Sequence, residues 1–179
     1  MSTMELPRLP MTAEEFERLP EVEGWRMELW EGNLDVAAAA QIAWHSSTAW
    51  QVAAVLKAGQ QVVHMEVGIV LGPRTVRAPD VTRFRPGLHP NINKSQFPAA
   101  DVDLVVEIIS PESAQRDRNV KPEEYARAGI PELWLIERHP DEADAMVNIF
   151  RLGPSAVYLP TRSVALSDLP KELEQEIER

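Results

Sequence analysis

The segment DLVVEIISP at residues 103–111 constrains the fold of this chain more than any other stretch. Leu, Val and Ile dominate it, and a short apolar run that ends at Ser-Pro is typical of a strand buried inside a sheet. Glu107 lies in the middle of this run. A carboxylate there loses its hydration, so it must be kept neutral by a raised pKa, paired with a cation or bound to a metal ion. The sequence therefore predicts a core strand that carries one functional or paired acid.

The bulk properties of the chain are those of one folded domain. It has 179 residues, of which 44% are hydrophobic and 26% charged, and this suits a single unit over residues 1–179. We expect a loose proline-rich arm at 1–10 and a C-terminal extension at 161–179. The chain has no cysteine, and we see neither an apolar leader nor a stretch apolar enough to span a bilayer, so we expect a cytoplasmic protein with no membrane partner.

The net charge of -10 opposes passive adhesion to nucleic acid, which normally relies on clustered Lys and Arg. It does not exclude a catalytic encounter, because a cation bound by acidic groups reverses the local sign that a phosphate meets.

Hydrophobic periodicity and turn residues predict an α/β fold in which helices pack on a central mixed sheet. An N-terminal β-hairpin precedes this core. In chain order, the expected elements are a helix at 12–19, the hairpin at 25–38, a long helix at 41–59, strands at 60–71 and 76–84, a loop at 85–101, the buried strand at 102–110, a helix at 120–129, a strand at 131–138, an antiparallel pair at 145–152 and 156–160, and a final helix at 170–179.

Asp80 is a second acid placed on a strand. It follows Pro79 at the start of DVTRF, and the proline favours extended backbone just before it. If the strands of Asp80 and Glu107 are neighbours, the two carboxylates converge on one point. A hard divalent cation prefers oxygen ligands and keeps some of its own water, so the sequence predicts Mg²⁺, or Mn²⁺, at this point.

Lys121 completes the group of candidate site residues. It begins the helix that follows the buried strand, fourteen positions after Glu107. An ammonium group there could reach back toward the acids, position a water molecule and stabilise the charge of a pentavalent phosphorane. An Asp, a Glu, a Lys and a metal ion together make a phosphodiesterase site.

These residues stand in motifs that resemble the Uma-type restriction endonuclease family, a branch of the PD-(D/E)XK nuclease superfamily. The similar segments cover roughly residues 12–160 and are APD at 78–80, DLVVEIISPES at 103–113, RDRNVKPEEYARAGIPELWLIE at 116–137, WRMELWEGNL at 25–34 and WHSSTAWQVAAVL at 44–56. The resemblance implies a restriction-endonuclease-like core and metal-dependent cleavage of the DNA backbone.

Residue by residue, the resemblance assigns Asp80 and Glu107 as metal-binding acids and Lys121 as the catalytic lysine. It also brings Glu28 of the hairpin toward the site, and His45 lies near a position where the family often has a histidine. The superfamily pattern places its lysine two residues after the second acid, where this chain has Ile109. Lys121 must therefore act from the helix.

Structural alternatives stand beside these roles. Glu107 could be a buried acid satisfied by Arg116, Lys121 or backbone donors, and we expect Arg116 and Asp117 to form a local ion pair. An inactive nuclease fold that binds nucleic acid or protein is the main alternative function, and hydrolysis of a smaller phosphate ester is another. The exposed apolar hairpin is compatible with a homodimer.

Overall fold

The computed structural model describes residues 10–38, 43–111, 113–138 and 144–177. The expected arm at 1–10 lies outside this part of the chain, apart from Pro10. Within these ranges, no helix is both long enough and apolar enough to cross a membrane.

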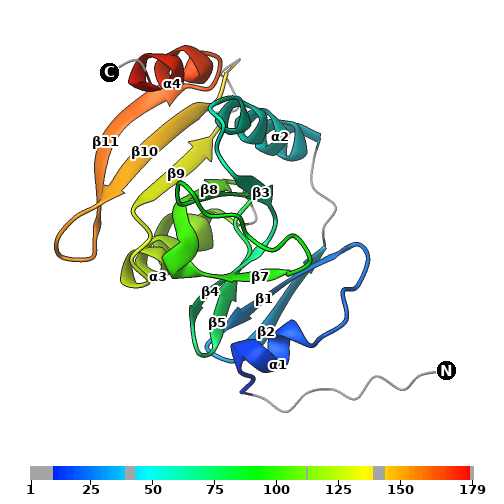
Figure 1. The fold of residues 1–179 in the computed structure, drawn as a ribbon. Helices are drawn as coiled ribbons and strands as arrows, with labels where there is room; N and C mark the ends of the chain where they lie inside the picture. The colour runs from blue at the N-terminus through cyan, green and yellow to red at the C-terminus, as the bar shows by residue number, and fades with distance from the viewer. Residues whose placement is uncertain (1–9, 39–42, 112, 139–143, 178–179) are drawn as a thin grey trace.

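A six-stranded mixed sheet forms the centre of the molecule (Figure 1). Strands β8 (Val102–Ile108) and β9 (Glu132–Glu137) pair in parallel through a crossover that contains helix α3 (Lys121–Arg127), and the other pairs in this sheet are antiparallel. In spatial order the strands are β11 (Tyr158–Ala165), β10 (Met146–Leu152), β9 (Glu132–Glu137), β8 (Val102–Ile108), β6 (Val81–Phe84) and β3 (Val63–Met65). The buried run around Glu107 is thus an interior strand, as its composition predicts.

A second, five-stranded sheet carries the N-terminal hairpin. Its order is β2 (Asn33–Ala38), β1 (Trp25–Trp30), β5 (Thr75–Arg77), β4 (Gly68–Gly72) and β7 (Gln96–Pro98). Hairpin pairing runs from Trp25 opposite Ala38 to Trp30 opposite Asn33. Because side chains alternate along a strand, Arg26 and Glu28 lie on the same face of β1.

In the described ranges, four α-helices pack against these sheets. They are α1 (Ala13–Glu17), α2 (Ala43–Ala58), α3 (Lys121–Arg127) and α4 (Leu169–Ile177), and shorter helical turns lie at Ala99–Asp101 and Arg116–Val120. Helix α1 begins with the predicted capping box, in which Thr12 accepts from the Glu15 amide and Glu15 accepts from the Thr12 amide.

Two apolar layers cover the two faces of the six-stranded sheet. Val106 and Ile108 face the first layer, where α2 and α4 contribute Val52 and Leu169. The residue between them in sequence, Glu107, faces the other side, toward α3. Val105 lies on that side and packs in the second layer, so the alternation of side chains along β8 directs the acid to α3.

The structure confirms the α/β class and the helices flanking a mixed sheet, but it corrects two strand predictions. The expected strand at 60–71 is two strands, β3 and β4, and the expected strand at 76–84 is also two, β5 and β6. In each case the two halves belong to different sheets. Glu66, between β3 and β4, has a positive φ of 54°, a conformation that interrupts a strand.

The expected loop at 85–101 also contains the short strand β7, which pairs in parallel with β4. The described part of the segment at 161–179 forms the end of β11 and helix α4, and it contributes Leu169 to the first apolar layer.

Candidate active site

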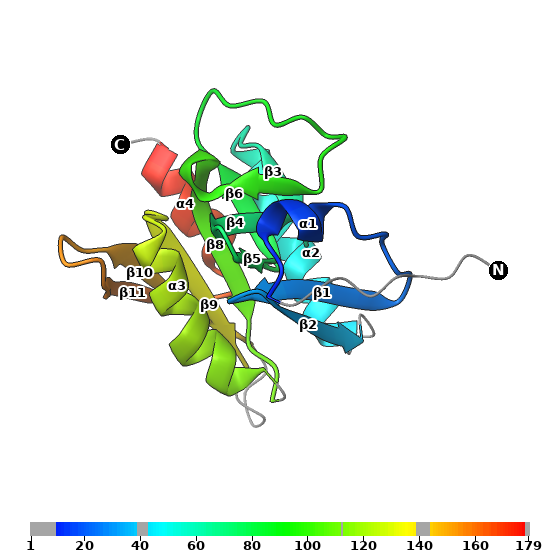
Figure 2. The ribbon, with the colours of Figure 1, turned by 90° about the horizontal axis from the view of Figure 1, so that it is seen from below.

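Four separate segments bring the predicted site residues together. Glu28 comes from β1, Asp80 from the residue just before β6, Glu107 from β8 and Lys121 from the first position of α3. In the view of Figure 2, β8 passes between α3 and the β1–β2 hairpin, and Lys121 of α3 contacts Glu107 of β8 and Glu28 of the hairpin. All four side chains are buried, so each charge needs a partner inside the protein.

Lys121 is the centre of this cluster. Its Nζ lies 3.0 Å and 2.9 Å from the two carboxylate oxygens of Glu107 and 3.4 Å from Oε1 of Glu28. Tyr125, one helical turn further along α3, donates its hydroxyl to Oε1 of Glu107 at 2.5 Å. The lysine therefore does reach back from the helix to the acid on the strand, as the position of Ile109 requires.

Glu28 is held in place by two donors on β5 and just after it. Nη1 of Arg77 donates to its Oε2 at 3.0 Å, and the Ala78 amide donates to its Oε1 at 3.0 Å. Arg77 also makes a bidentate contact with Glu124 of α3, at 2.7 Å and 3.0 Å. This arginine thus links the hairpin sheet to the helix that carries Lys121.

The two oxygens of Asp80 have different partners. Oδ2 accepts from the Ile108 amide at 2.6 Å and lies 3.3 Å from Nε2 of His45. Oδ1 accepts from Nη1 of Arg26 at 2.9 Å. Because Ile108 is the residue after Glu107, the backbone contact fixes the Asp80 carboxylate beside the second acid.

Asp117 is a fourth buried acid near the lysine. Its Oδ1 lies 3.2 Å from Nζ of Lys121, one turn away, and has no hydrogen bond from the described residues. The expected local pair between Arg116 and Asp117 is therefore wrong. The turn at Arg116–Val120 is π-helical, which directs Asp117 inward and leaves Arg116 to pair with Asp35 of β2.

The charges of the cluster shift the pKa values of its members in different directions. Burial raises the pKa of Glu107 to about 7, and nearby Asp117 and Asp80 add to the rise that Lys121 opposes. Burial also disfavours the charged form of Glu28, but Lys121 and two arginines lower its pKa to about 2. Glu107 thus carries the least stabilised negative charge in the group.

The pKa of Asp80 falls to about 2 despite its burial, because His45 donates a hydrogen bond and Arg26 adds its charge. Burial disfavours the charge on Lys121, yet Glu107, Glu28 and Asp117 raise the pKa of the lysine above its usual value. The lysine is therefore a cation shared among three acids.

The donor set of the cluster suits a hard divalent cation. Carboxylate oxygens are the ligands that Mg²⁺ prefers, and this ion needs only one or two protein carboxylates because water and substrate oxygens fill its other positions. Asp80 and Glu107 supply two. Across the part of the chain that the structure describes, no three His, Asp or Glu side chains gather in a geometry that could hold a metal ion, so any further ligands would come from water or substrate.

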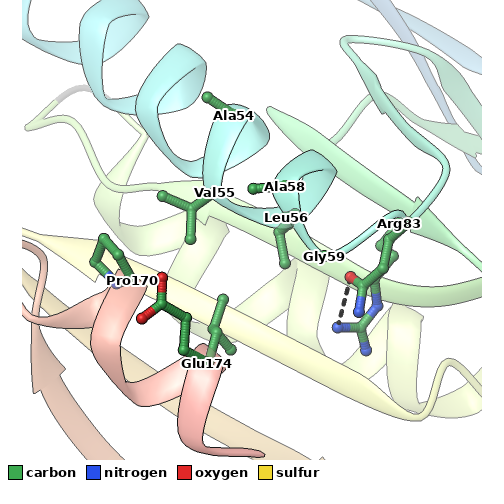
Figure 3. Close-up of a pocket in the computed structure, with 10 residues that line it drawn as sticks. Ala54, Val55, Leu56, Ala58, Gly59, Arg83, Pro170 and Glu174 are labelled. Atoms are coloured by element: carbon green, nitrogen blue, oxygen red, sulfur yellow. Dashed lines mark hydrogen bonds between the residues drawn. The ribbon is translucent and has the colours of Figure 1, made fainter. Parts of the chain in front are cut away.

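Two cavities differ in their relation to the cluster. One of about 560 Å³ lies between α2 and α4 and is lined by Val55, Leu56 and Pro170 (Figure 3). None of the cluster residues lines it. The other, of about 530 Å³, is lined by Arg26 and Ala78 beside the acids, so this second cavity is the one that adjoins the cluster.

The structure brings the predicted acids and lysine together, but the sequence interpretation missed three residues that contact them. Arg26, Tyr125 and Asp117 all contact the predicted residues directly. Tyr125 and Asp117 lie four positions on either side of Lys121, a spacing that places side chains on one helix face. Arg26 precedes Glu28 by two positions and shares its face of the strand. These spacings are the signals that could have identified them.

The raised pKa of Glu107 predicts a specific pH dependence of stability without metal. Its proton-bound form favours the folded state, so this stabilisation is complete below the unfolded pKa of 4.5 and is lost as pH rises through about 7. We expect the free energy of unfolding in EDTA to fall by up to about 3 kcal/mol between pH 5 and pH 8. Urea denaturation at both pH values measures this change.

Glu107→Gln is the control for this prediction, because it removes the titrating group. The pKa of His45 is also raised, by its contacts with Asp80 against the effect of burial, and it adds to the same fall in both proteins. The difference between wild type and variant therefore reports on Glu107 alone. An identical fall in the two proteins would contradict the assignment.

Comparisons with known proteins bear on the fold and the family of this chain. A solved structure from Anabaena variabilis, described as a putative nuclease belonging to DUF820, matches with a TM-score of 0.63 and 24% sequence identity, over 87% of this chain and 84% of that one. This likeness shows the shared fold. No match was found among functionally curated proteins. Residues 13–178 match the family described as "Uma2: Putative restriction endonuclease". Because the match spans most of the sequence, the chain belongs to the Uma2 family.

Proposed function

We propose that this protein is a metal-dependent endonuclease that hydrolyses phosphodiester bonds of DNA. The observation that carries the proposal is the convergence of Asp80, Glu107 and Lys121 from three separate segments onto one buried cluster. Membership of a family described as restriction endonucleases supports the reaction class. Mg²⁺ is the proposed ion, with Mn²⁺ as a substitute.

In this proposal Asp80 and Glu107 hold the ion, which when bound polarises the phosphoryl oxygen and lowers the pKa of water. The Ile108 amide and His45 orient Asp80 by occupying Oδ2. Tyr125 and Lys121 orient Glu107 through its two oxygens. The acids are thus fixed in position before substrate arrives, which reduces the reorganisation needed for the reaction.

Lys121 has the proposed role of positioning the attacking water and stabilising the charge that develops on the phosphate. Its ammonium group has three donors; it donates to both oxygens of Glu107, and Glu28 and Asp117 lie at ion-pair distance. The third donor is available to the attacking water or the phosphate. Glu28 assists by keeping the lysine charged and oriented.

We extend the proposal to the cellular location and the oligomeric state. We place the enzyme in the cytoplasm, in keeping with a chain that contains no cysteine. Two copies could pair through apolar side chains of the hairpin, where Trp25 and Trp30 are about half exposed.

An inactive nuclease fold that binds nucleic acid or protein is the second candidate. One observation favours it, since protein donors already contact each oxygen of Asp80 and Glu107. The net charge of -10 also disfavours passive DNA binding. Among the described residues, four buried acids stand against two buried Lys and Arg side chains in this cluster, and this excess of acids favours the enzyme instead.

Nicking of supercoiled plasmid DNA tests the choice between these functions. We expect conversion to open circles with Mg²⁺ or Mn²⁺ and none in EDTA, because the acids need the ion to act on a phosphate. A parallel assay with RNA and with bis(p-nitrophenyl) phosphate separates a DNA enzyme from a hydrolase of smaller esters. Failure to cleave plasmid under every metal condition would favour the inactive module.

A further inference from the structure

Arg26 is the cation in direct contact with the acid oxygen that the proposed metal would use. Its Nη1 donates to Oδ1 of Asp80 at 2.9 Å, and its Nη2 donates to the Ala78 carbonyl. The same Nη2 lies 3.9 Å from Oε1 of Glu28. The guanidinium therefore stands between two acids of the cluster.

The partners of Asp80 show why this contact matters. Oδ2 is already engaged by the Ile108 amide and by His45, and both donors are fixed by the fold. Oδ1 has Arg26 as its hydrogen-bond donor. Oδ1 is thus the oxygen of Asp80 that can bind a metal ion, and it becomes available when the Arg26 guanidinium moves.

Arg26 is less completely held than the other buried cations of the cluster. Its Nε is buried and donates to no partner among the described residues, whereas Arg77 donates from Nε, Nη1 and Nη2 to two acids. The Arg26 side chain is 19% exposed and that of Arg77 is 1% exposed. A side chain with fewer contacts costs less to displace.

The protein also has space into which Arg26 can move. The cavity of about 530 Å³ beside the cluster is lined by Arg26 itself. Glu23 and Glu66 line the same cavity and are exposed. A guanidinium that leaves Asp80 therefore finds both volume and carboxylate partners on that side.

We propose that Arg26 is the resident counter-ion of Asp80, which holds the acid cluster together without metal and competes with the divalent cation for Oδ1. This inference rests on the proposed function, because it takes Asp80 and Glu107 as the metal ligands. It assigns to Arg26 a positioning role that sets the metal affinity. The affinity of the wild type for the divalent cation is lowered because the ion must first displace the Arg26 guanidinium from Oδ1 of Asp80.

Removing the charge of Arg26 should lower the stability of the metal-free protein and raise its affinity for the metal ion. Without metal, Asp80 loses its main cationic partner, so the apo protein becomes less stable. With metal, the ion no longer competes with or is repelled by the guanidinium, so binding becomes tighter. A structural role alone would lower stability without improving metal binding.

Isothermal titration with MnCl₂, together with melting in EDTA, tests this inference on wild type, Arg26→Met and Arg26→Gln. We expect both variants to melt at lower temperature in EDTA and to bind Mn²⁺ about tenfold more tightly than wild type. Glutamine keeps a donor for Asp80, so it carries the same expectation if the methionine variant does not fold. Arg74→Met, at an exposed position outside the cluster, should match wild type in both measurements.

The outcomes separate the inference from the proposed function. Binding of Mn²⁺ by wild type, with equal or weaker binding by the folded variants, overturns the role of Arg26 and leaves the metal site in place. Absence of binding by wild type and variants alike overturns both. Binding by the variants alone supports the inference in its strongest form.

Discussion

Replacing Lys121 with methionine should lower both the stability of the protein and its cleavage of DNA, and we expect this to be the largest single effect on folding. Lys121 is in contact with Glu28, Glu107 and Asp117, all buried. Methionine leaves these three acids without their shared cation. Loss of one partner from a buried ion pair costs about 3–5 kcal/mol, and urea denaturation at pH 7 in EDTA measures this loss.

The catalytic part of the effect can be separated from the structural part. The double variant Lys121→Met with Asp117→Asn removes the lysine together with one buried acid that is not a proposed metal ligand, so it should recover some of the lost stability. It should not recover DNA cleavage, which we expect to stay lower than wild type by about 10²–10³-fold. Lys94→Met, at an exposed loop position, is the matched control and should change neither. A folded Lys121→Met protein with wild-type cleavage would refute the catalytic role.

Asp80→Asn should abolish the response of the protein to divalent metal. The amide is nearly the same size as the carboxylate and can still accept from the Ile108 amide, but it lacks the negative charge that binds the ion. Because a metal ion contributes several kcal/mol to stabilisation of the transition state, cleavage should fall by about 10³-fold or more. Thermal melting with and without Mn²⁺ measures the binding directly, since a ligand specific for the folded state raises its stability.

Asp103→Asn is the control for this second variant. Asp103 also lies on β8, but its carboxylate pairs with Arg83 at 2.6 Å and is partly exposed. We expect it to keep the full rise in melting temperature with Mn²⁺. An equal rise in Asp80→Asn and wild type would show that metal binds somewhere other than the proposed site.

Much of the site could be predicted because its geometry follows from local rules. Glu107 must face away from Val106 and Ile108, since neighbours on a strand point to opposite sides, and the structure places it so. The family resemblance supplied Glu28, whose side chain lies 3.4 Å from Lys121. The structure brings these predicted residues together, while their roles in metal binding and catalysis stay predictions.

The missed contact between Arg26 and Asp80 depends on how the hairpin joins the second sheet. Arg26 reaches Asp80 across 54 positions of sequence, and this requires β1 to join the sheet of β5, which no local pattern specifies. The division of 60–71 into β3 and β4 has the same origin, because each half pairs with a distant strand. Asp117 was assigned to its neighbour Arg116 because proximity in sequence suggested a local pair. The π-helical turn sends the two side chains to different partners.

Crystals soaked in MnCl₂ would show directly whether Asp80 and Glu107 bind one divalent cation between them. Anomalous scattering locates Mn²⁺ without reference to any assumed ligand. We expect one strong peak about 2.0–2.4 Å from Oδ1 of Asp80 and from a carboxylate oxygen of Glu107, with the Arg26 guanidinium moved away from Asp80. Crystals of an ion-loaded protein with no peak at these acids, and with Arg26 still bonded to Asp80, would contradict this expectation.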